Sequence, residues 1–362
     1  MSKWKAVVDN GKARLVKKKI EDFHLDNAEN VVIEEPDWLI YGYIPKSGIT
    51  VLAGEGGTGK TSIICSIAAA VTTGKKHFLQ EENPFEDNPI PETVAIFSAE
   101  DSWSYVLKKR LQDCGADTSK ILYMSPQDER FVELNFNGEL LKGIIEENKP
   151  SLIIFDPVQA FVPEHLRMGD RNAMRKCFAP LIGYGEKYGI TFIVIVHANK
   201  LSGVWGRKRM ADSSDIWDAA RSVLMIGNVP DSELRYISHE KSNWGKYQKS
   251  VIFELDECVP VFKSYTTKKD KDFILEDSKI KKNDTSASDL AKDFIISTLC
   301  EHKQMEVKEL DELAKVSGIS THALKDAKAE LNKEKQVHTW SIGYGKDKKF
   351  LITLKDTENT DE

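Results

Sequence analysis

The sequence predicts an α/β fold: a core with a mostly parallel sheet and helices on both faces, followed by a small C-terminal domain. Between residues 46 and 257, strand-like and helix-like stretches alternate, which is typical of a parallel sheet. The first strands are continuous apolar runs rather than alternating ones, as strands buried on both faces should be. With 362 residues and 41% apolar composition, the chain is long enough for about two domains.

The composition excludes several classes of protein. The net charge is -6, so the whole chain carries no basic signal for nucleic acid, although a local basic loop could still bind it. The five cysteines form no C-x-x-C pair and no histidine-flanked cluster, so we expect reduced thiols in a cytoplasmic protein rather than disulfides or zinc ligands. The N-terminus lacks an apolar signal core and no run approaches ~18 apolar residues, so we expect neither export nor membrane insertion.

Composition shifts divide the chain into four segments. Residues 1–35 are charged and weakly patterned, and we expect an N-terminal arm that is either solvated or docked on a neighbouring subunit. Residues 36–262 form the α/β core. Residues 263–286 are polar, lysine-rich and short of apolar anchors, which predicts a linker. The remainder, 287–356, is the small C-terminal domain.

The strands of the core fall into two groups. The first group has continuous apolar composition and comprises residues 48–53, 93–98, 151–155 and 190–196. The second group lacks long intervening helices and comprises residues 222–226, 234–239 and 250–255. We therefore expect the second group to be antiparallel strands that extend one edge of the sheet.

The C-terminal segment has a pattern of its own. Residues 289–300, 307–316 and 320–332 have helical periodicity, and 337–354 reads as two strands around a turn at residues 343–345. Three helices and a hairpin in about 70 residues are the outline of a winged helix, a fold that binds DNA or protein.

A phosphate-binding loop lies between the first core strand and a helix predicted over residues 62–71. The loop matches the pattern G-x-x-x-x-G-K-[ST] with Gly54, Glu55, Gly56, Gly57, Thr58, Gly59, Lys60 and Thr61. Its glycines let backbone N–H groups curl around a phosphate, and the helix N-terminus adds partial positive charge. Lys60 would reach the β- and γ-phosphates, and the Thr61 hydroxyl would contact Mg²⁺. The sequence therefore predicts a bound nucleoside triphosphate with Mg²⁺.

Further polar side chains close three neighbouring core strands. Asp156 has the position of a Walker B acid that holds Mg²⁺, although a surface acid ending a strand is the alternative. Glu100 and Asp101 follow the second strand, and we prefer Glu100 as the base that activates water. His197 ends the fourth strand and is either a γ-phosphate sensor or a structural histidine. The carboxyl ends of parallel strands meet at one crevice, so these groups should face the same site.

Two basic residues could complete the site from a neighbouring protomer. Arg221 precedes a strand of the second group and Lys241 follows one. An arginine supplied across an interface neutralises transition-state charge and makes hydrolysis depend on assembly. The alternative for each is an ordinary surface or salt-bridged residue.

The loop at residues 200–211 combines two glycines, Trp205 and three adjacent cations, Arg207, Lys208 and Arg209. Flexible backbone, cations and an aromatic ring suit a loop that tracks the phosphates of single-stranded DNA. A solvated charged loop is the alternative.

The ordered set of motifs resembles the RecA-like P-loop ATPases, and within them the plasmid RepA-type hexameric replicative helicases and related phage or mobile-element proteins. The resemblance covers residues 36–257 and is carried by these stretches: Pro36-Asp-Trp-Leu-Ile40, Gly54–Thr61, Ser98-Ala-Glu-Asp101, Ile154-Phe-Asp-Pro157, Val196-His-Ala-Asn-Lys200, Asp218-Ala-Ala-Arg221 and Lys241-Ser-Asn-Trp-Gly245.

The resemblance implies ATP and Mg²⁺ as cofactors, bound by Lys60 and Thr61, with Asp156 as the Walker B acid. It implies Glu100 as the general base, His197 as the sensor and Arg221 as a finger acting in trans. Such ATPases form rings, usually hexamers, with nucleotide between subunits.

The leading functional expectation is an ATP-driven helicase that moves on single-stranded DNA. A regulatory or assembly switch and a recombination or repair accessory use the same nucleotide site and stay open. The C-terminal domain departs from the plasmid RepA type, which is largely a bare core. Between residues 285 and 354 there are eleven lysines, no arginine and eleven acids, so this domain is not an obviously basic DNA module.

Overall fold

The computed structural model divides into two compact units, Met1–Pro36 and Asp37–Glu362. It describes residues 4–9, 12–17, 27–33, 35–80, 90–163, 166, 170–199, 204–210, 214–284, 287–343 and 348–355. The first unit contains an antiparallel hairpin of β1 (Trp4–Asp9) and β2 (Lys12–Lys17), then a 3₁₀ turn at Ala28–Asn30. The predicted N-terminal arm therefore includes regular structure, and its docking on a neighbour stays a prediction.

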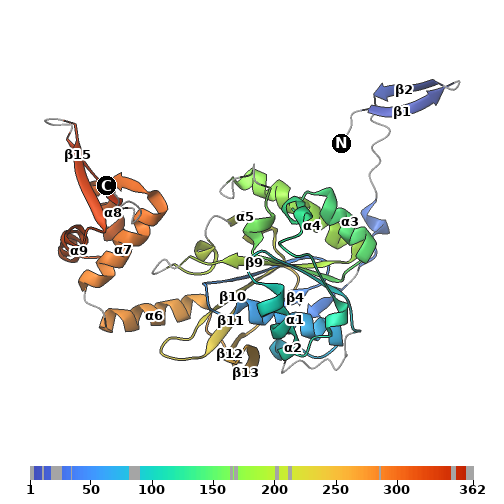
Figure 1. Ribbon diagram of the computed structural model, residues 1–362, viewed down its shortest axis with the longest axis horizontal. Helices are drawn as coiled ribbons and strands as arrows, with labels where there is room; N and C mark the ends of the chain where they lie inside the picture. The colour runs from blue at the N-terminus through green and yellow to red at the C-terminus, as the bar shows by residue number, and fades with distance from the viewer. Residues whose placement is uncertain are drawn as a thin grey trace. The chain divides into compact units, whose positions relative to one another are not determined.

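The second unit is built on one nine-stranded sheet (Figure 1). In spatial order its strands are β13 (Val259–Thr266), β12 (Ser250–Asp256), β11 (Arg235–Ser242), β10 (Ser222–Asn228), β5 (Ile49–Gly54), β9 (Thr191–His197), β8 (Leu152–Asp156), β6 (Val94–Ser98) and β7 (Ile121–Tyr123). The strands from β10 to β7 are mutually parallel, and β11, β12 and β13 are antiparallel. The predicted α/β fold with a mostly parallel sheet is confirmed.

Helices cover both faces of this sheet, as Figure 1 shows. One face is covered by α3 (Glu139–Asn148), α4 (Arg171–Tyr188) and α5 (Ser214–Ala219). The other face is covered by α1 (Lys60–Thr73) and α2 (Lys108–Asp113). Successive side chains of a strand point to opposite faces. Because helices cover both faces, every residue of β5 is buried. This is why the core strands are continuous apolar runs in the sequence.

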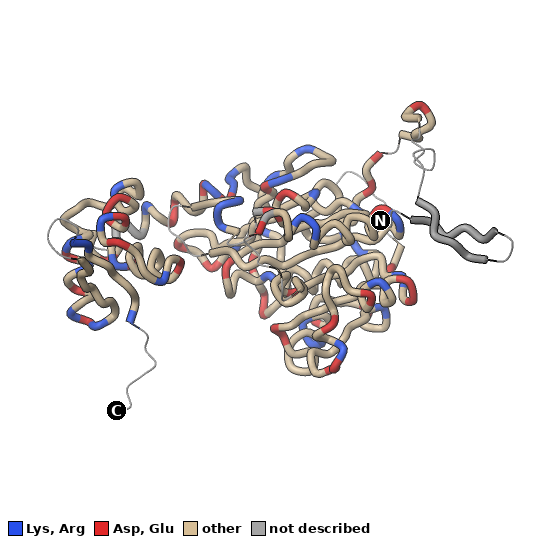
Figure 2. The backbone as a smooth tube through the Cα atoms, turned by 90° about the horizontal axis from the view of Figure 1, so that it is seen from above, with Lys and Arg blue, Asp and Glu red and all other residues tan. Residues whose placement is uncertain are grey.

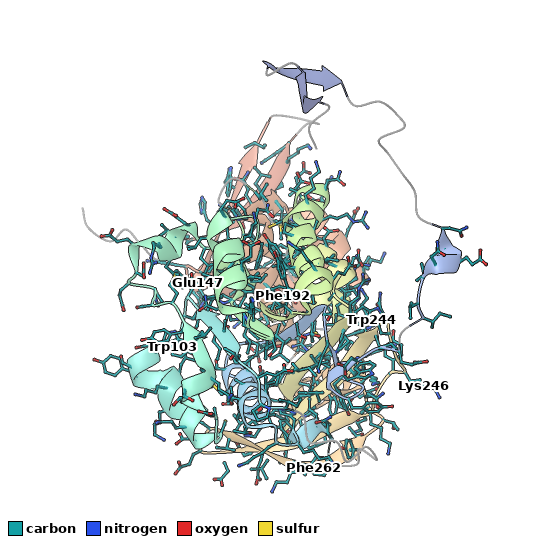
Figure 3. The ribbon with its side chains drawn as sticks, turned by 90° about the vertical axis from the view of Figure 1, so that its right-hand side faces the viewer. Trp103, Glu147, Phe192, Trp244, Lys246 and Phe262 are labelled. Atoms are coloured by element: carbon teal, nitrogen blue, oxygen red, sulfur yellow. The ribbon has the colours of Figure 1, made fainter. Side chains whose placement is uncertain are left out.

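Aromatic side chains fill the α3–α4 side of the core. Phe192 lies at the centre of the packed region in Figure 3, stacked near Phe155 at 6.5 Å between ring centroids. Phe136 meets Phe155 edge-on at 4.9 Å, an arrangement that adds about 0.5–1.5 kcal/mol beyond area burial. Local signals end the helices: α1 stops at Gly74, whose φ of 66° is the left-handed conformation that glycine adopts readily.

A short hairpin precedes the phosphate loop. It consists of β3 (Trp38–Ile40) and β4 (Ile44–Pro45). Ile40 and Ile44 are buried in the α1-side core, and the Tyr43 hydroxyl donates a hydrogen bond to the Lys249 carbonyl at 2.8 Å. This lead-in therefore anchors the first core strand.

One strand direction differs from the prediction. β10, expected to be antiparallel, pairs in parallel with β5 from Ser222 opposite Thr50 to Ile226 opposite Gly54. The chain reaches β10 from β9 through α5, and such a crossover returns it to the same end of the sheet. The short length of α5 concealed this crossover in the sequence.

The stretch predicted as a linker, residues 263–286, is largely regular structure. It begins inside β13, and most of it is α6 (Asp270–Asp284). β13 is an edge strand whose backbone pairs with β12, so it needs few buried side chains. α6 is anchored through Phe273, which is 2% exposed and stacks on Tyr236 at 3.9 Å between ring centroids. A single aromatic anchor is not visible as a sequence pattern.

The C-terminal part contains the predicted helices and strands. They are α7 (Ala287–His302), β14 (Gln304–Glu306), α8 (Val307–Val316), α9 (Thr321–Lys333), β15 (Val337–Ile342) and β16 (Lys349–Leu354), with the strands ordered β14-β16-β15. Their own cluster of buried residues includes Leu299, Leu310, Leu324 and Ile352. β14 was not predicted, and residues 344–345 of the expected turn lie outside the described residues.

Charged residues of both signs are interspersed along the sheet-containing part and the C-terminal part of the chain (Figure 2). In the described part of the chain, no helix combines the length and the apolar character needed to span a membrane.

Candidate active site

The phosphate loop occupies the turn between β5 and α1. β5 ends at Gly54 and α1 begins at Lys60, with Gly59 as its N-cap in the left-handed region at φ 96°. A Cβ atom added to Gly56 or Gly57 would meet open space. The loop thus leaves room beside its backbone and beside the helix N-terminus, where a phosphate would receive N–H hydrogen bonds.

The loop's lysine is folded onto its own backbone. Lys60 Nζ donates hydrogen bonds to the Gly54 carbonyl at 2.9 Å and the Glu55 carbonyl at 2.8 Å. The Thr58 hydroxyl also donates to the Glu55 carbonyl, at 2.8 Å. Thr61 is half-buried in the first turn of α1. A bound triphosphate would therefore compete with two carbonyls for the lysine, and the Glu55 carbonyl is the acceptor shared within the loop.

The charges at the end of the sheet beside the phosphate loop favour a bound cation. Burial raises the pKa of Asp156 to about 7, Glu100 and Asp101 push it the same way, and Lys60 opposes them. Burial lowers the pKa of Lys60, while Asp156, Glu100 and Glu55 oppose that shift. Asp156 is 4% exposed, so its ionised form lacks water and has carboxylates as neighbours. A divalent cation would relieve this, and the residues present fit Mg²⁺ bound through Thr61, Asp156 and phosphate oxygens.

Glu100 and His197 are brought together from β6 and β9, the two parallel strands on either side of β8. His197 stands opposite Gly54 in the β5–β9 register, and its Nε2 lies 3.1 Å from Glu100 Oε1. Asp101 instead forms an ion pair with Arg110 at 3.6 Å. Of the two acids after β6, Glu100 is thus the one held beside the phosphate loop. Its contact with His197 was not predicted.

Arg221 and Lys241 lie at the other end of the strands, where β5 begins, and we call this end of the strands the far edge of the sheet. Arg221 directly precedes Ser222, which pairs with the start of β5, whereas the phosphate loop follows the end of β5. At about 3.3 Å per residue, five residues separate the two edges by roughly 16 Å along the strand. Lys241 is at the same far edge, opposite Val223. The structure does not bring either residue to the phosphate loop of its own chain.

The far edge is basic. Lys241 Nζ donates to the carbonyls of Trp217 at 2.7 Å and Asp218 at 3.1 Å. Burial lowers the pKa of Lys241, Asp218 raises it, and the charges of Arg221 and Arg207 lower it further. We call Arg221 and Lys241 the basic edge, and Arg207 of the cationic loop adds its charge to theirs at Lys241. Its charges lie close enough to influence one another.

The cationic loop is described only from Val204 to Met210, and Lys200–Gly203 and Ala211 lie outside the described residues. Lys208 is exposed, Arg207 is half-exposed and pairs with Asp218 at 2.7 Å, and Trp205 is 36% exposed. These three remain candidates for contact with DNA.

Arg209 differs from the expectation of an exposed DNA contact. Its side chain is 2% exposed and lies between two carboxylates, Glu55 and Asp270, at 2.6 Å from each. The sequence shows three adjacent cations, but the 3₁₀ helix at Gly206–Arg209 turns the third one inward. Arg209 is a buried structural cation in this fold.

Comparison with known proteins agrees with this geometry. The family described as an AAA domain matches residues 17–203, just over half of the chain. The chain belongs to this AAA-domain family. DNA repair protein RadA from Helicobacter pylori (strain ATCC 700392 / 26695) is 21% identical over 226 residues. The match covers 62% of this chain and 43% of that protein, so the chain spans less than half of the relative's length. The core of this chain is that of a RecA-like P-loop ATPase.

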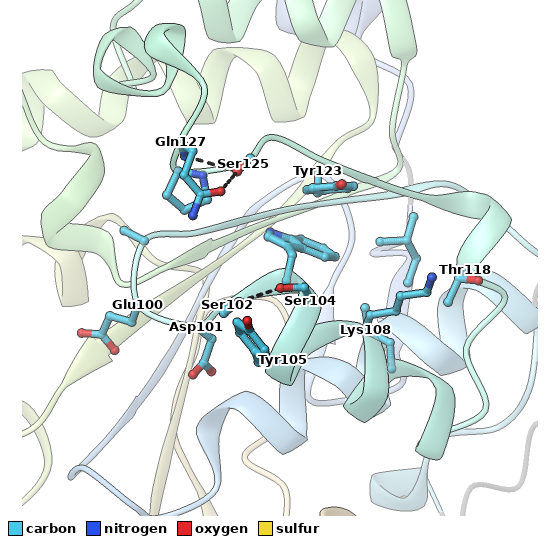
Figure 4. Close-up of a pocket in the computed structure, with 15 residues that line it drawn as sticks. Glu100, Asp101, Ser102, Ser104, Tyr105, Lys108, Thr118, Tyr123, Ser125 and Gln127 are labelled. Atoms are coloured by element: carbon cyan, nitrogen blue, oxygen red, sulfur yellow. Dashed lines mark hydrogen bonds between the residues drawn. The ribbon is translucent and has the colours of Figure 1, made fainter.

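A cavity beside the site was missed by sequence reasoning. In this AAA-domain protein a pocket of about 770 Å³ opens next to Glu100 and Asp101 (Figure 4). Trp103 stacks on Tyr123 there, with ring centroids 4.2 Å apart. Trp103 Nε1 is buried and has no hydrogen-bond partner among the described residues. Aromatic residues soon after Glu100 were the available signal, but Tyr123 comes from another strand.

Proposed function

We propose that this AAA-domain protein is a subunit of a ring-shaped replicative DNA helicase of a plasmid, phage or mobile element. In this proposal, ATP hydrolysis between subunits drives movement along single-stranded DNA. The observation that carries it is the separation of charge between the two sheet edges: the acids Asp156 and Glu100 lie beside the phosphate loop, and Arg221 and Lys241 are roughly 16 Å away along the strands. A site of this kind is completed when the basic edge of one subunit meets the phosphate loop of the next.

Each candidate residue then has a defined task. Bound ATP with Mg²⁺ supplies the phosphoryl group and the cation that neutralises its charge. Lys60 leaves the two loop carbonyls to hold the terminal phosphates. Glu100 accepts the proton of the attacking water. His197, whose Nε2 lies 3.1 Å from Glu100 Oε1, acts as the sensor that links the position of this base to the presence of the terminal phosphate. Arg221 and Lys241 of a neighbouring subunit neutralise transition-state charge.

The proposed DNA contact is the exposed part of the cationic loop. The Asn199 backbone N–H donates to the Arg209 carbonyl at 2.8 Å, and Asn199 follows His197 by two residues. The strand that carries the sensor is thereby connected to the segment that carries Arg207 and Lys208. A shift of His197 on hydrolysis would move these cations relative to a bound strand.

The C-terminal helices and hairpin are proposed to form a winged-helix-like domain over residues 287–356. The order helix, strand, two helices and hairpin supports this. Equal numbers of lysines and acids favour a docking role, either to DNA or to a replication partner protein, over a strongly electrostatic one.

Two other functions are compatible with the ATPase core. One is a regulatory or assembly switch without movement on DNA. The other is a recombination or repair accessory, which the similarity to a protein named for DNA repair favours. Both would hydrolyse ATP without separating strands.

The test is the ATPase rate with and without single-stranded DNA, together with strand displacement on a forked duplex. Wild type should be stimulated by DNA and should separate the fork, and Glu100→Gln should bind ATP but do neither. If wild type shows no stimulation and no displacement, the helicase proposal is wrong. Stimulation without displacement would favour the recombination or repair function.

A further inference from the structure

Arg209 is one of the largest fully buried side chains of the described chain, and both ends of its guanidinium are engaged. Nη2 donates to Glu55 Oε1 and Nη1 donates to Asp270 Oδ1, each at 2.6 Å. A planar guanidinium holds two carboxylates in a fixed relative position better than a flexible ammonium would. Arg209 therefore links two points that are far apart in the sequence.

The first point is the phosphate loop. Glu55 is its second residue, and the Glu55 carbonyl accepts the hydrogen bond from Lys60 Nζ at 2.8 Å. When Lys60 turns toward a triphosphate, this bond is exchanged, and the Glu55 carbonyl keeps only the Thr58 hydroxyl of the two side-chain donors described for it. The Glu55 side chain remains attached to Arg209, so a change in the peptide is passed to the guanidinium.

The second point is the start of α6. Asp270 is fully buried and, besides Arg209, accepts hydrogen bonds from the Tyr236 hydroxyl and the Gly206 N–H, both at 2.8 Å. Its own N–H is bonded to Ser238 Oγ at 3.1 Å. Asp270 thus fixes the first turn of α6, the helix that leads along the chain to α7.

We propose that Arg209 is a positioning residue that couples the nucleotide state of the phosphate loop to the first turn of α6. The geometry favours coupling because Arg209 and Asp270 are buried and the guanidinium lies 2.6 Å from each carboxylate. A displaced guanidinium cannot find replacement hydrogen bonds in water there. Nucleotide binding therefore changes the stability of the α6 start, and the docking of α6 changes the affinity for nucleotide in return.

The coupling rests on nucleotide binding at the phosphate loop alone, and it does not require movement on DNA. Its failure can be told from failure of the helicase proposal, since strand displacement plays no part in the measurement. Glu55 then has a role beyond lining the loop, because the Glu55 side chain connects the loop to Arg209.

The experiment is amide hydrogen exchange across residues 270–276, with and without a non-hydrolysable ATP analogue and Mg²⁺. Calorimetry under the same conditions establishes analogue binding for each protein. In wild type, the analogue should change exchange at the α6 start by about fivefold or more, the low end of measured couplings. In Glu55→Ala, at saturating analogue, that response should disappear. Glu55 is one-third exposed, so this variant should fold.

Lys268→Ala is the matched control. Lys268 Nζ pairs with Glu276 of α6 at 2.8 Å on the exposed side of the helix, and neither residue is bonded to the phosphate loop in the described contacts. This variant loses an ion pair of α6 and should keep the wild-type response to the analogue. The proposal is overturned if wild type binds the analogue without any change at residues 270–276, or if Glu55→Ala responds as wild type does.

Discussion

The two edges of the large sheet hold two lysines in similar ways but in opposite surroundings. Lys60 donates to the carbonyls of Gly54 and Glu55, and Lys241 donates to those of Trp217 and Asp218. Burial lowers the pKa of both lysines. The difference lies in the charges that surround each one.

Around Lys60 the neighbouring charges are carboxylates, which oppose the loss of its proton. Around Lys241, Asp218 is the one described acid that does so, and Arg221 and Arg207 act in the other direction. One edge therefore has an excess of acids and the other an excess of cations. Neither lysine is therefore surrounded by balanced charges, and each edge has the sign of charge that the other lacks.

The largest expected effect is on the acidic edge. Glu100→Gln should lower the ATPase rate by about 10²- to 10⁴-fold, the usual contribution of a general base, while analogue binding persists. Asp101→Asn is the control, because Asp101 is paired with Arg110 rather than with His197. Steady-state hydrolysis and analogue titration measure both quantities. Equal losses in the two variants would show that this edge acts only through its total charge.

A buried histidine close to the basic edge should lower the stability of the protein in acid. His239, two residues from Lys241, is fully buried, and burial, with a smaller effect of Lys269, lowers its pKa to about 4. In the unfolded chain His239 takes up a proton near pH 6.5, whereas in the folded chain it does so only near pH 4. The free energy of unfolding should thus be unaffected by His239 above that pH and fall by about 1.4 kcal/mol per pH unit between 6.5 and 4.

Equilibrium denaturation between pH 4.5 and 7.5 measures this slope. His77, whose burial lowers its pKa to about 3, adds a slope of the same sign. His239→Gln should remove its own share of the slope and leave that of His77. An unchanged slope in the variant would mean that His239 is protonated in the folded protein.

A smaller effect tests whether the acidic edge lacks a cation. At neutral pH and without nucleotide, Asp156→Asn should raise the free energy of unfolding by roughly 1–3 kcal/mol, because it removes a buried carboxylate whose pKa is raised to about 7. Hydrolysis should be lost in the same variant. Thermal melts without and with Mg²⁺ and nucleotide check this. A destabilised variant would contradict the excess of negative charge that we describe.

The smallest effect concerns the cationic loop. Lys208→Gln should reduce the slope of single-stranded DNA affinity against salt by roughly 0.7, the value for one phosphate contact. Lys142→Gln in α3 is the control on a partly exposed lysine that pairs with Glu139 at 3.5 Å, and it should leave the slope unchanged. Fluorescence anisotropy at several salt concentrations measures it. The same slope in wild type and Lys208→Gln would exclude this loop as a phosphate contact.

Local patterns made the core and the phosphate loop predictable. Continuous apolar runs identified the buried strands, and the strand, loop and helix context identified Gly54–Thr61. The edge strand β13 and helix α6 were missed because backbone pairing and one buried aromatic hold them. The contacts of Arg209 with Glu55 and of Glu100 with His197 join residues 154 and 97 positions apart. No spacing rule reports such pairs, so only the folded chain reveals that one predicted DNA contact is buried.

In the proposed ring, the acidic edge of one subunit is completed by the basic edge of another. Mixing Lys60→Ala with Arg221→Ala, each of which should be inactive alone, measures whether the two edges act together. In randomly mixed rings about a quarter of the interfaces pair an intact phosphate loop with an intact Arg221, so a matching fraction of hydrolysis should return. A mixture whose subunits demonstrably co-assemble and which still hydrolyses no ATP would contradict the claim.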